Sequence, residues 1–268
     1  MTDQDFIFDV QHVTLRFGGV TSLNDVSLQQ SRGEILSVIG PNGAGKTSLF
    51  NCLTGVYEPQ EGSITFQPVP GKSISVVGRQ PHRVARAGVA RTFQTSRMFN
   101  ALTTFENVKI GVEAHQKTGP VGAMLKLPRT RREEKYSDQR AHELLESVGL
   151  THRTNTLADS LPYGDRRRLE IARCLGTNPR ALLLDEPAAG TNPSEKLALG
   201  ELIIRINREL DISILLIEHD MKLVMAVAQR LVVLNFGGII AEGTPRDIQE
   251  NPRVIEAYLG TNEEAGTQ

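Results

Sequence analysis

The chain has 268 residues, with 30 Lys and Arg against 31 Asp and Glu and a formal net charge of −1. This balance excludes a global positive field that would draw the protein onto nucleic acid or anionic lipid, so we expect no nucleic-acid partner. A chain of this length is enough for one large domain or two small ones, and it buries roughly 70–75% of its unfolded surface, which sustains a substantial core.

Cysteine usage and hydropathy bear on location. Cys52 and Cys174 match neither metal-ligand nor disulfide-framework spacing, which fits a reducing cytoplasm. The opening MTDQDFIFDV lacks the basic segment and apolar run of a secretory signal. No run approaches the ~18 continuous apolar residues of a membrane-spanning helix. We therefore expect a cytoplasmic protein that is soluble, or peripheral through a partner.

The first predicted elements are antiparallel strands followed by a strand, a turn and a helix. Polar and apolar residues alternate in FIFDVQHVTLRF and LNDVSLQ, as in half-buried strands. The short apolar strand EILSVIG then enters a Gly-rich turn and the helix KTSLFNCLTG. In that helix Leu49, Phe50 and Leu53 share one face, and Gly55 is the expected stop.

The second half predicts a mainly parallel sheet. ALLLD, SILLI and LVVLN are short apolar runs separated by helical stretches at 193–210 and 221–229. Between the halves we expect a polar, helix-rich insert over 95–175, in which residues 113–136 form a solvated loop. The fold class is therefore α/β, as one domain over 1–268 with a core of 1–94 and 176–245, the helical insert, and a C-terminal tail at 246–268.

GPNGAGKT, after a predicted strand and before a helix, matches the phosphate-loop pattern G-x-x-x-x-G-K-[ST] in the context that the motif requires. Glycines let backbone N–H groups turn around phosphates, Lys46 can reach the β- and γ-phosphates, and Thr47 can offer its hydroxyl to Mg²⁺. The candidate nucleotide-binding residues here are Gly40, Pro41, Asn42, Gly43, Ala44, Gly45, Lys46, Thr47 and Ser48.

Polar side chains follow two of the later strands. Asp185 ends ALLLD, where it can hold a metal through water, and Glu186 can orient or deprotonate an attacking water. His219 follows SILLI, hence lies at the same sheet edge, where it can contact the γ-phosphate and that water. Gln94 has an amide able to bind Mg²⁺ and water together. The alternatives are solvated acids, a structural histidine and a surface glutamine.

A turn at Leu161–Asp165, LPYGD, precedes a helical run. Taken alone it is an ordinary junction with Asp165 as the N-cap and a buried stripe at Leu169, Ala172 and Leu175. Together, however, the phosphate loop, Gln94, this turn, LDEP and His219 have the order and spacing of an ABC transporter ATP-binding subunit, which the chain resembles over nearly its whole length.

The resemblance implies roles for Phe17 and for the turn at Leu161–Asp165. Phe17 lies where that family stacks an aromatic ring on adenine, with core packing as the alternative. The turn lies where the family has its signature, which caps the γ-phosphate held by a second ATPase subunit in a head-to-tail pair. Its functional residues here are Tyr163, Gly164 and Asp165.

Two departures from the family pattern bear on activity. The usual signature reads Leu-Ser-Gly-Gly-Gln, so Pro162 and Tyr163 stand where the family has a serine and a glycine. Either the site hydrolyses slowly, or Tyr163 and the helix N-terminus replace the missing donors. Asn192 stands where the family usually has an aspartate, which weakens a charge-based account of cross-talk between the two sites.

ARTFQ, YGDRRRLEIAR, IEHDM and GTPRDIQENPRVIEAYLG resemble the larger ATP-binding subunit of branched-chain amino acid importers. That likeness implies ATP, Mg²⁺, a second ATP-binding subunit, transmembrane permeases, an extracytoplasmic solute-binding protein, and a place on the cytoplasmic face of the inner membrane. Alternatives are a cassette for urea, another small solute or lipid, or a non-transport ATPase. A permease helix would dock on Met98, Phe99, Leu102 and Phe105, or these residues pack the insert.

Overall fold

A computed structural model describes residues 5–92, 98–114 and 128–264 of the chain. Contacts divide it into two compact units. The first consists of Met1–Arg91, Arg180–Ala188 and Lys196–Gln268, and the second of Thr92–Pro179 and Ala189–Glu195. The helical insert that the sequence predicts over 95–175 falls within the second unit.

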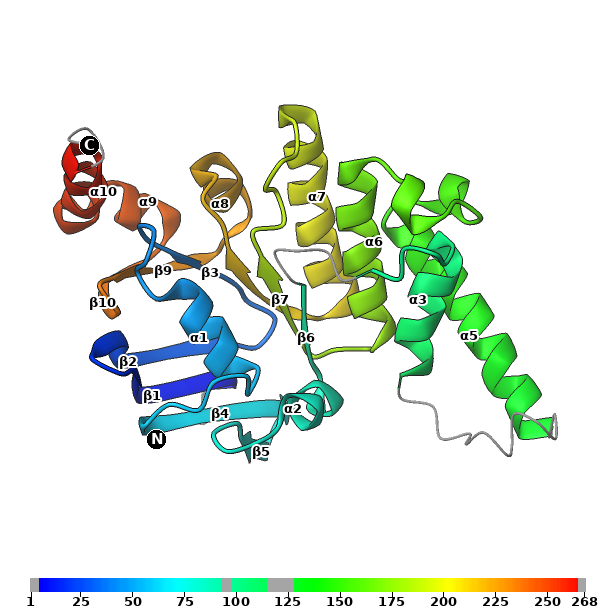
Figure 1. Ribbon diagram of the computed structural model, residues 1–268, viewed down its shortest axis with the longest axis horizontal. Coiled ribbons are helices and arrows are strands. Elements are labelled where there is room, and N and C mark those ends of the chain that lie inside the picture. Colours follow the sequence, from blue (N-terminus) through cyan, green and yellow to red (C-terminus); the bar gives the residue numbers. More distant parts are fainter. Residues whose placement is uncertain (1–4, 93–97, 115–127, 265–268) are drawn as a thin grey trace. The chain divides into compact units, whose positions relative to one another are not determined.

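The first unit holds two sheets (Figure 1). The antiparallel sheet has the order β2-β1-β4-β5, and its strands are β1 (Phe6–Phe17), β2 (Val20–Ser31), β4 (Glu61–Val69) and β5 (Lys72–Ser75). The second sheet has the order β10-β9-β3-β8-β7-β6. Its strands are β3 (Ile35–Ile39), β6 (Val89–Arg91), β7 (Ala181–Asp185), β8 (Ser213–Ile217), β9 (Arg230–Asn235) and β10 (Gly238–Gly243). Neighbours in it pair in parallel except β9 and β10, so the predicted α/β class is confirmed.

Two apolar clusters cover opposite faces of the mainly parallel sheet. Helix α1 (Lys46–Leu53) buries Leu49, Phe50 and Leu53 between the two sheets, together with Val38 of β3. Ile39, whose side chain points to the other face because side chains alternate along a strand, joins a cluster formed with the C-terminal helices. Helices of the first unit are α1, α2 (Pro81–Ala87), α7 (Pro193–Leu210, whose first turn belongs to the second unit), α8 (Met221–Val227), α9 (Pro245–Gln249) and α10 (Pro252–Glu264).

The segment predicted as a C-terminal tail follows β10 and forms the helices α9 and α10 (Figure 1). A capping box starts α9, because the Thr244 hydroxyl accepts from the Asp247 N–H and the Asp247 carboxylate accepts from the Thr244 N–H. Ile248 and Val254 are buried in the cluster that contains Ile39. The end of the chain is therefore packed against the core up to α10.

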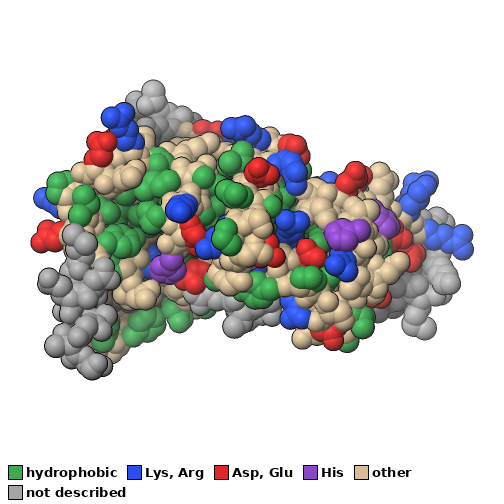
Figure 2. Space-filling view, turned by 90° about the horizontal axis from the view of Figure 1, so that it is seen from above, with side chains coloured by type: hydrophobic (Ala, Val, Ile, Leu, Met, Phe, Trp, Pro, Cys, Tyr) green, Lys and Arg blue, Asp and Glu red, His purple; other side chains and the backbone are tan. Residues whose placement is uncertain are grey.

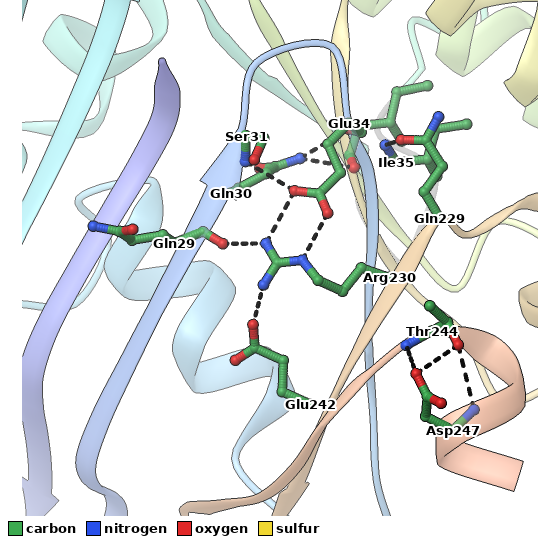
Figure 3. Close-up of polar contacts among 11 residues, drawn as sticks. Gln29, Gln30, Ser31, Glu34, Ile35, Gln229, Arg230, Glu242, Thr244 and Asp247 are labelled. Carbon is green, nitrogen blue, oxygen red and sulfur yellow. Dashed lines mark hydrogen bonds and ion pairs between the residues drawn. The ribbon is translucent and has the colours of Figure 1, made fainter. Parts of the chain in front are cut away.

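An arginine at the start of β9 ties several strands together (Figure 3). Arg230 Nε donates to Glu34 Oε1 at 2.7 Å, and its Nη atoms also reach Glu34, Glu242 and the Gln29 carbonyl. Charge-assisted bonds of this kind link β2, β9, β10 and Glu34, the residue directly before β3, at the end of the sheet away from the phosphate loop. Their role is structural.

The second unit is built from helices. They are α3 (Thr104–Glu113), α5 (Pro128–Ser147) and α6 (Tyr163–Gly176), with short 3₁₀ turns at Thr151–Arg153 and Ala158–Ser160. A β-carbon on Gly111 would lie 2.3 Å from the Arg173 carbonyl oxygen, so α3 and α6 pack with their backbones close together. The prediction of a loop over 113–136 is wrong from Pro128 onward. From Arg131 to Lys135 that charged stretch consists of good helix formers, and it belongs to the amphipathic helix that buries Leu144 and Leu145.

The surface charges and the two cysteines are arranged as the sequence predicts. Figure 2 shows basic and acidic side chains interspersed among apolar ones on one face, with neither sign dominating. Cys52 and Cys174 are buried, and burial raises the pKa of each thiol to about 12, which makes both poor nucleophiles. Among the residues that the structure describes, no helix is both long enough and apolar enough to cross a membrane.

Candidate active site

The phosphate loop joins β3 to α1 and requires glycine at two close approaches. Gly40 has φ +149, and a β-carbon there would lie 2.1 Å from the Leu234 carbonyl oxygen of β9. Gly45, at φ +102, would place a β-carbon 2.5 Å from the Ser22 carbonyl oxygen of β2. Because only glycine fits at either position, β9 and β2 fix the path of the loop.

Lys46, the first residue of α1, curls back across the loop. Its Nζ donates to the carbonyl oxygens of Gly40 at 2.7 Å and Pro41 at 2.8 Å. Burial lowers the pKa of the Lys46 amine, although the negative charges of Glu186 and Asp185 oppose that shift. The amine is thus held by neutral carbonyls at a place where an anion would be a better partner.

The remaining loop residues have separate surroundings. Asn42, Gly43 and Thr47 are exposed, and no side chain caps the N-terminus of α1. The hydroxyls of Ser48 and Ser22 lie 2.7 Å apart, so Ser48 is bonded to β2. Exposed loop amides and an uncapped helix N-terminus favour an anionic ligand, which is the chemistry of a nucleotide phosphate.

Asp185, at the end of β7, is buried and paired with an arginine. Arg91 Nη2 donates to Asp185 Oδ2 at 2.8 Å, and Arg91 Nη1 donates to Asn51 Oδ1 of α1 at 2.6 Å. The guanidinium carbon also lies 5.5 Å from the centre of the Phe50 ring. Arg91 therefore compensates the carboxylate and links β6, β7 and α1.

Glu186 and His219 lie together at the edge where β7 and β8 end. These strands pair in parallel, with Asp185 opposite Ile217. His219 Nε2 is 2.8 Å from Glu186 Oε1, and both side chains are partly exposed. Glu186 has φ +48, and its N–H donates to the Ile217 carbonyl oxygen at 2.9 Å. The predicted common edge is thus observed as a direct contact.

Glu218, a residue that the motif analysis did not single out, holds the backbone of this edge. Its buried carboxylate accepts from the N–H groups of Ala188 at 2.6 Å, His219 at 3.0 Å and Asp220 at 3.4 Å. Burial raises the pKa of the Glu218 carboxyl, the three N–H groups oppose the shift, and the charge of Glu186 adds to it. Asp220 then caps α8 and pairs with Lys196 at 2.6 Å.

Phe17 lies at the end of β1 with its ring partly exposed. It is 46% accessible, so core packing does not explain it. Its ring centre lies 5.1 Å from that of Tyr57 in an edge-on arrangement. The pair presents an aromatic surface in the same unit as the phosphate loop, which suits stacking on a planar base.

The signature turn lies in the second unit, where α6 begins at Tyr163. Pro162 is the N-cap and no side chain caps the helix, so the expectation that Asp165 would be the N-cap is wrong. The helix starts three residues earlier because Pro162, with φ −54 and ψ 154, has the non-helical backbone of an N-cap directly before Tyr163. Asp165 instead lies in the first turn, where an acid complements the helix dipole.

Tyr163 and Gly164 contact the loop that follows β7. A β-carbon on Gly190 would lie 3.2 Å from the Tyr163 ring, and the Tyr163 hydroxyl accepts from Arg167 at 2.8 Å. A β-carbon on Gly164 would lie 2.8 Å from Glu195 Oε1, so a larger residue there would require the Glu195 side chain or α6 to move. The ring of Tyr163 thus lies against the loop that follows β7.

Asn192 acts as a cap in this loop. Its Oδ1 accepts from the Glu195 N–H at 2.9 Å, and its own N–H donates to Glu195 Oε2 at 2.9 Å, so the two residues brace the start of α7. An aspartate could accept the same bond. The departure from the family's usual residue therefore preserves the local structure.

The four residues proposed to contact a permease helix are partly accessible. Met98, Leu102 and Phe105 are half-buried and Phe99 is 49% exposed. Phe99 lies under the Arg173 guanidinium at 5.7 Å, and the Phe105 ring centre lies 4.7 Å from that of His142. These residues both pack within the unit and remain accessible.

The structure thus brings Gly40–Ser48, Asp185, Glu186, His219 and Phe17 into the first unit, and Tyr163, Gly164 and Asp165 into the second. Gln94 lies outside the described residues. Arg91 was missed, although an arginine at the end of an apolar strand and directly before TFQ was a usable signal. Asn51 lies one turn after Thr47 on the same helix face, and this spacing is a sequence signal that connects Asn51 with the phosphate loop.

Known proteins with similar sequences are ATP-binding subunits of ABC transporters. A family model described as ABC transporter matches residues 23–189, and one described as branched-chain amino acid ATP-binding cassette transporter matches residues 239–264. The high-affinity branched-chain amino acid transport ATP-binding protein BraF of Pseudomonas aeruginosa is 47% identical, over 95% of this chain and 98% of its own. The protein of the same description named LivG, from Salmonella typhimurium, is 48% identical over 94% and 96%.

Solved structures agree with the fold. The ADP conformation of an ATP-binding cassette of an ABC transporter superposes with a TM-score of 0.81, at 30% sequence identity, covering 95% of this chain and 99% of that chain. The predicted α/β fold with a phosphate loop, like that of an ABC transporter ATP-binding subunit, is confirmed. The chain belongs to the ABC transporter family, in the group of branched-chain amino acid transport ATP-binding proteins.

Proposed function

We propose that this chain binds and hydrolyses ATP and thereby powers an importer of branched-chain amino acids. The observation that carries the proposal is the contact of Glu186 with His219 at 2.8 Å, at a sheet edge whose charges act on Lys46 of the phosphate loop. A base, its polar partner and a phosphate-binding amine thus share one unit of the chain. Family membership supports the same activity.

The phosphate loop would hold the nucleotide. Backbone N–H groups of Gly43 to Ser48 would bind the phosphates, with Lys46 leaving the Gly40 and Pro41 carbonyls to pair with the β- and γ-phosphates. Phe17, with Tyr57 beside it, would stack on the adenine ring. Pro41, Asn42, Ala44 and Gly45 would shape the loop around the phosphates.

Thr47 and Asp185 fit a magnesium site in their donor chemistry. The Thr47 residue is exposed, while Asp185 is buried and already bonded to Arg91, which agrees with contact to a metal through water. Gln94 is proposed as a third ligand. When bound, Mg²⁺ neutralises charge on the phosphate oxygens.

Glu186 would act as the general base. Its carboxylate would take a proton from water while the water oxygen attacks the γ-phosphorus, and the bond from that phosphorus to the bridging oxygen breaks to give ADP and phosphate. His219 would orient Glu186 and contact the γ-phosphate. The contact of 2.8 Å between the two side chains supports this pairing.

The signature residues would serve a second ATPase subunit. In a head-to-tail pair, Tyr163, Gly164 and Asp165 at the start of α6 would face the γ-phosphate bound by the partner, where a helix N-terminus favours an anion. We propose that this second subunit, transmembrane permeases and an extracytoplasmic solute-binding protein complete the complex. The chain would sit on the cytoplasmic face of the inner membrane, with Phe99 and its neighbours against a permease helix.

The transported solute is proposed from the relatives, which are named for branched-chain amino acid transport. Urea, other small solutes or lipid are the alternatives, because the solute meets the permeases and not this chain.

Nucleotide binding by purified protein tests the proposal. Lys46→Ala should abolish measurable ATP and ADP binding, whereas Glu186→Gln should bind ATP but fail to hydrolyse it in the membrane complex that co-purifies with the tagged chain. Tyr136→Phe, a change on the exposed side of α5, is the matched control and should behave as wild type. ATP binding that survives Lys46→Ala would contradict the assignment of the loop.

A further inference from the structure

A buried carboxylate lies beside the pair formed by Glu186 and His219. It belongs to Glu218, the first residue after β8. Glu218 is 4% exposed, so its carboxylate is shielded from water and needs hydrogen-bond partners within the protein. The two oxygens of the carboxylate have different partners, and these partners lie in the loops that follow two neighbouring strands, β7 and β8.

One oxygen binds the loop after β7. Glu218 Oε1 accepts from the Ala188 N–H at 2.6 Å. Two residues earlier in the same loop, Glu186 has φ +48, and its N–H donates to the Ile217 carbonyl oxygen at 2.9 Å. The turn at 186–188 is therefore bonded at both of its ends to residues 217 and 218. The backbone that carries the proposed base is held at two points.

The other oxygen binds the loop after β8. Glu218 Oε2 accepts from the N–H of His219 at 3.0 Å and from that of Asp220 at 3.4 Å. Asp220 is itself fixed, because its side chain caps α8 and pairs with Lys196 at 2.6 Å. One carboxylate thus joins the backbone of Ala188 to the backbone of His219 and Asp220.

The chemistry of these partners explains why a carboxylate suits this position. All three partners are N–H donors, and an ionised carboxylate offers acceptors only, with one oxygen for each loop. Glutamine has the same shape but a single acceptor oxygen, and its NH₂ group is a donor. Whichever way the amide is turned, Glu218→Gln sets this NH₂ group against a backbone N–H. The substitution therefore has to break the connection to one of the two loops.

We propose that Glu218 is a positioning residue, whose carboxylate ties the loop after β7 to the loop after β8 and so holds Glu186 and His219 in the arrangement that hydrolysis requires. The inference deepens the proposed function and rests on it. Glu218 touches neither nucleotide nor water in this role, because its oxygens accept from backbone N–H groups. Its effect passes through the two side chains that it sets in place.

The test compares Glu218→Gln with wild type at pH 8, which favours the ionised carboxyl. Single-turnover ATP hydrolysis is measured in the membrane complex that co-purifies with the tagged chain, and ATP affinity by calorimetric titration of the purified chain. We expect hydrolysis to fall about tenfold and ATP affinity to stay within about twofold, because the phosphate loop keeps its contacts. Glu201→Gln, the same change on an exposed residue of α7, should alter neither quantity.

Two further variants separate this role from a general effect on stability. If Glu218 acts through His219, Glu218→Gln combined with His219→Ala should be no more than about twofold slower than the slower single variant. Ile203→Ala shortens a fully buried side chain of α7 and leaves the carboxylate in place. It should lower the free energy of unfolding but hydrolyse ATP at nearly the wild-type rate.

Wild-type hydrolysis by Glu218→Gln would overturn the inference. So would an equal loss of hydrolysis in Ile203→Ala, an ATP affinity that falls as much as hydrolysis does, or a double variant slowed by the product of the two single effects. Failure of the wild-type complex to hydrolyse ATP, or hydrolysis that survives Glu186→Gln, would instead overturn the proposed function, and the inference with it.

Discussion

His219 Nε2 and Glu186 Oε1 lie 2.8 Å apart, although 33 positions separate the two residues in the chain. If Glu186 is the general base and His219 orients it, Glu186→Gln should lower single-turnover ATP hydrolysis in the complex at least about 100-fold. His219→Ala should lower it at least about tenfold. Because the two act as a unit, the double variant should be no slower than Glu186→Gln. A double variant slower by the product of the two effects would show that the residues act independently.

The second prediction concerns the lack of space around Gly164. An added β-carbon would lie 2.8 Å from Glu195 Oε1 and 2.9 Å from its Cδ, so Gly164→Ala must displace Glu195 or the first turn of α6. We expect ATP binding by the isolated chain to be unchanged and hydrolysis by the complex to fall at least about tenfold. Gly238→Ala is the control, since its β-carbon would meet nothing closer than 3.8 Å. Equal hydrolysis by the two variants would remove Gly164 from the signature's function.

The main effect of replacing Arg91 should be a loss of folding stability. The Arg91 and Asp185 side chains are 8% and 1% exposed, so Arg91→Leu leaves a buried carboxylate without this cation. We expect a loss of about 3–5 kcal/mol in the free energy of unfolding, measured by urea denaturation. Adding Asp185→Asn to Arg91→Leu should recover part of that loss. A single variant within about 1 kcal/mol of wild type would contradict the pairing.

Glu218 predicts a dependence of stability on pH. Burial raises the pKa of its carboxyl in the folded chain above the ordinary value of 4.5, so between those two values the folded state binds more protons than the unfolded state. Its contribution to stability is full below pH 4.5 and is lost as pH rises through the raised value. Urea unfolding of wild type and Glu218→Gln across pH 4 to 8 should show this slope only in wild type. Parallel curves would contradict the shift.

Local patterns predicted much of this molecule because the responsible interactions are local. The phosphate-loop motif and the apolar strand before it placed Lys46 correctly at the start of α1. The common edge of Glu186 and His219 followed from the rule that parallel strands end at one edge. These predictions needed only a strand period and a motif.

Other features depend on contacts between distant parts of the chain. Arg91 meets Asp185 only because the sheet places β6 beside β7. The start of α6 was misplaced because Asp165 is a good N-cap by type, while the extended Pro162 ends the preceding loop directly before Tyr163. In these cases tertiary structure overrides a preference that the sequence carries locally.

The most direct test of the account is ATP hydrolysis by the membrane complex that co-purifies with the tagged chain. It should be measured with and without leucine, isoleucine and valine plus the solute-binding protein, with Glu186→Gln as the inactive control. We predict that these amino acids stimulate hydrolysis severalfold and that the control loses it. Hydrolysis that depends on Glu186 but ignores the amino acids would contradict the proposed cargo, and hydrolysis that survives Glu186→Gln would contradict the proposed site.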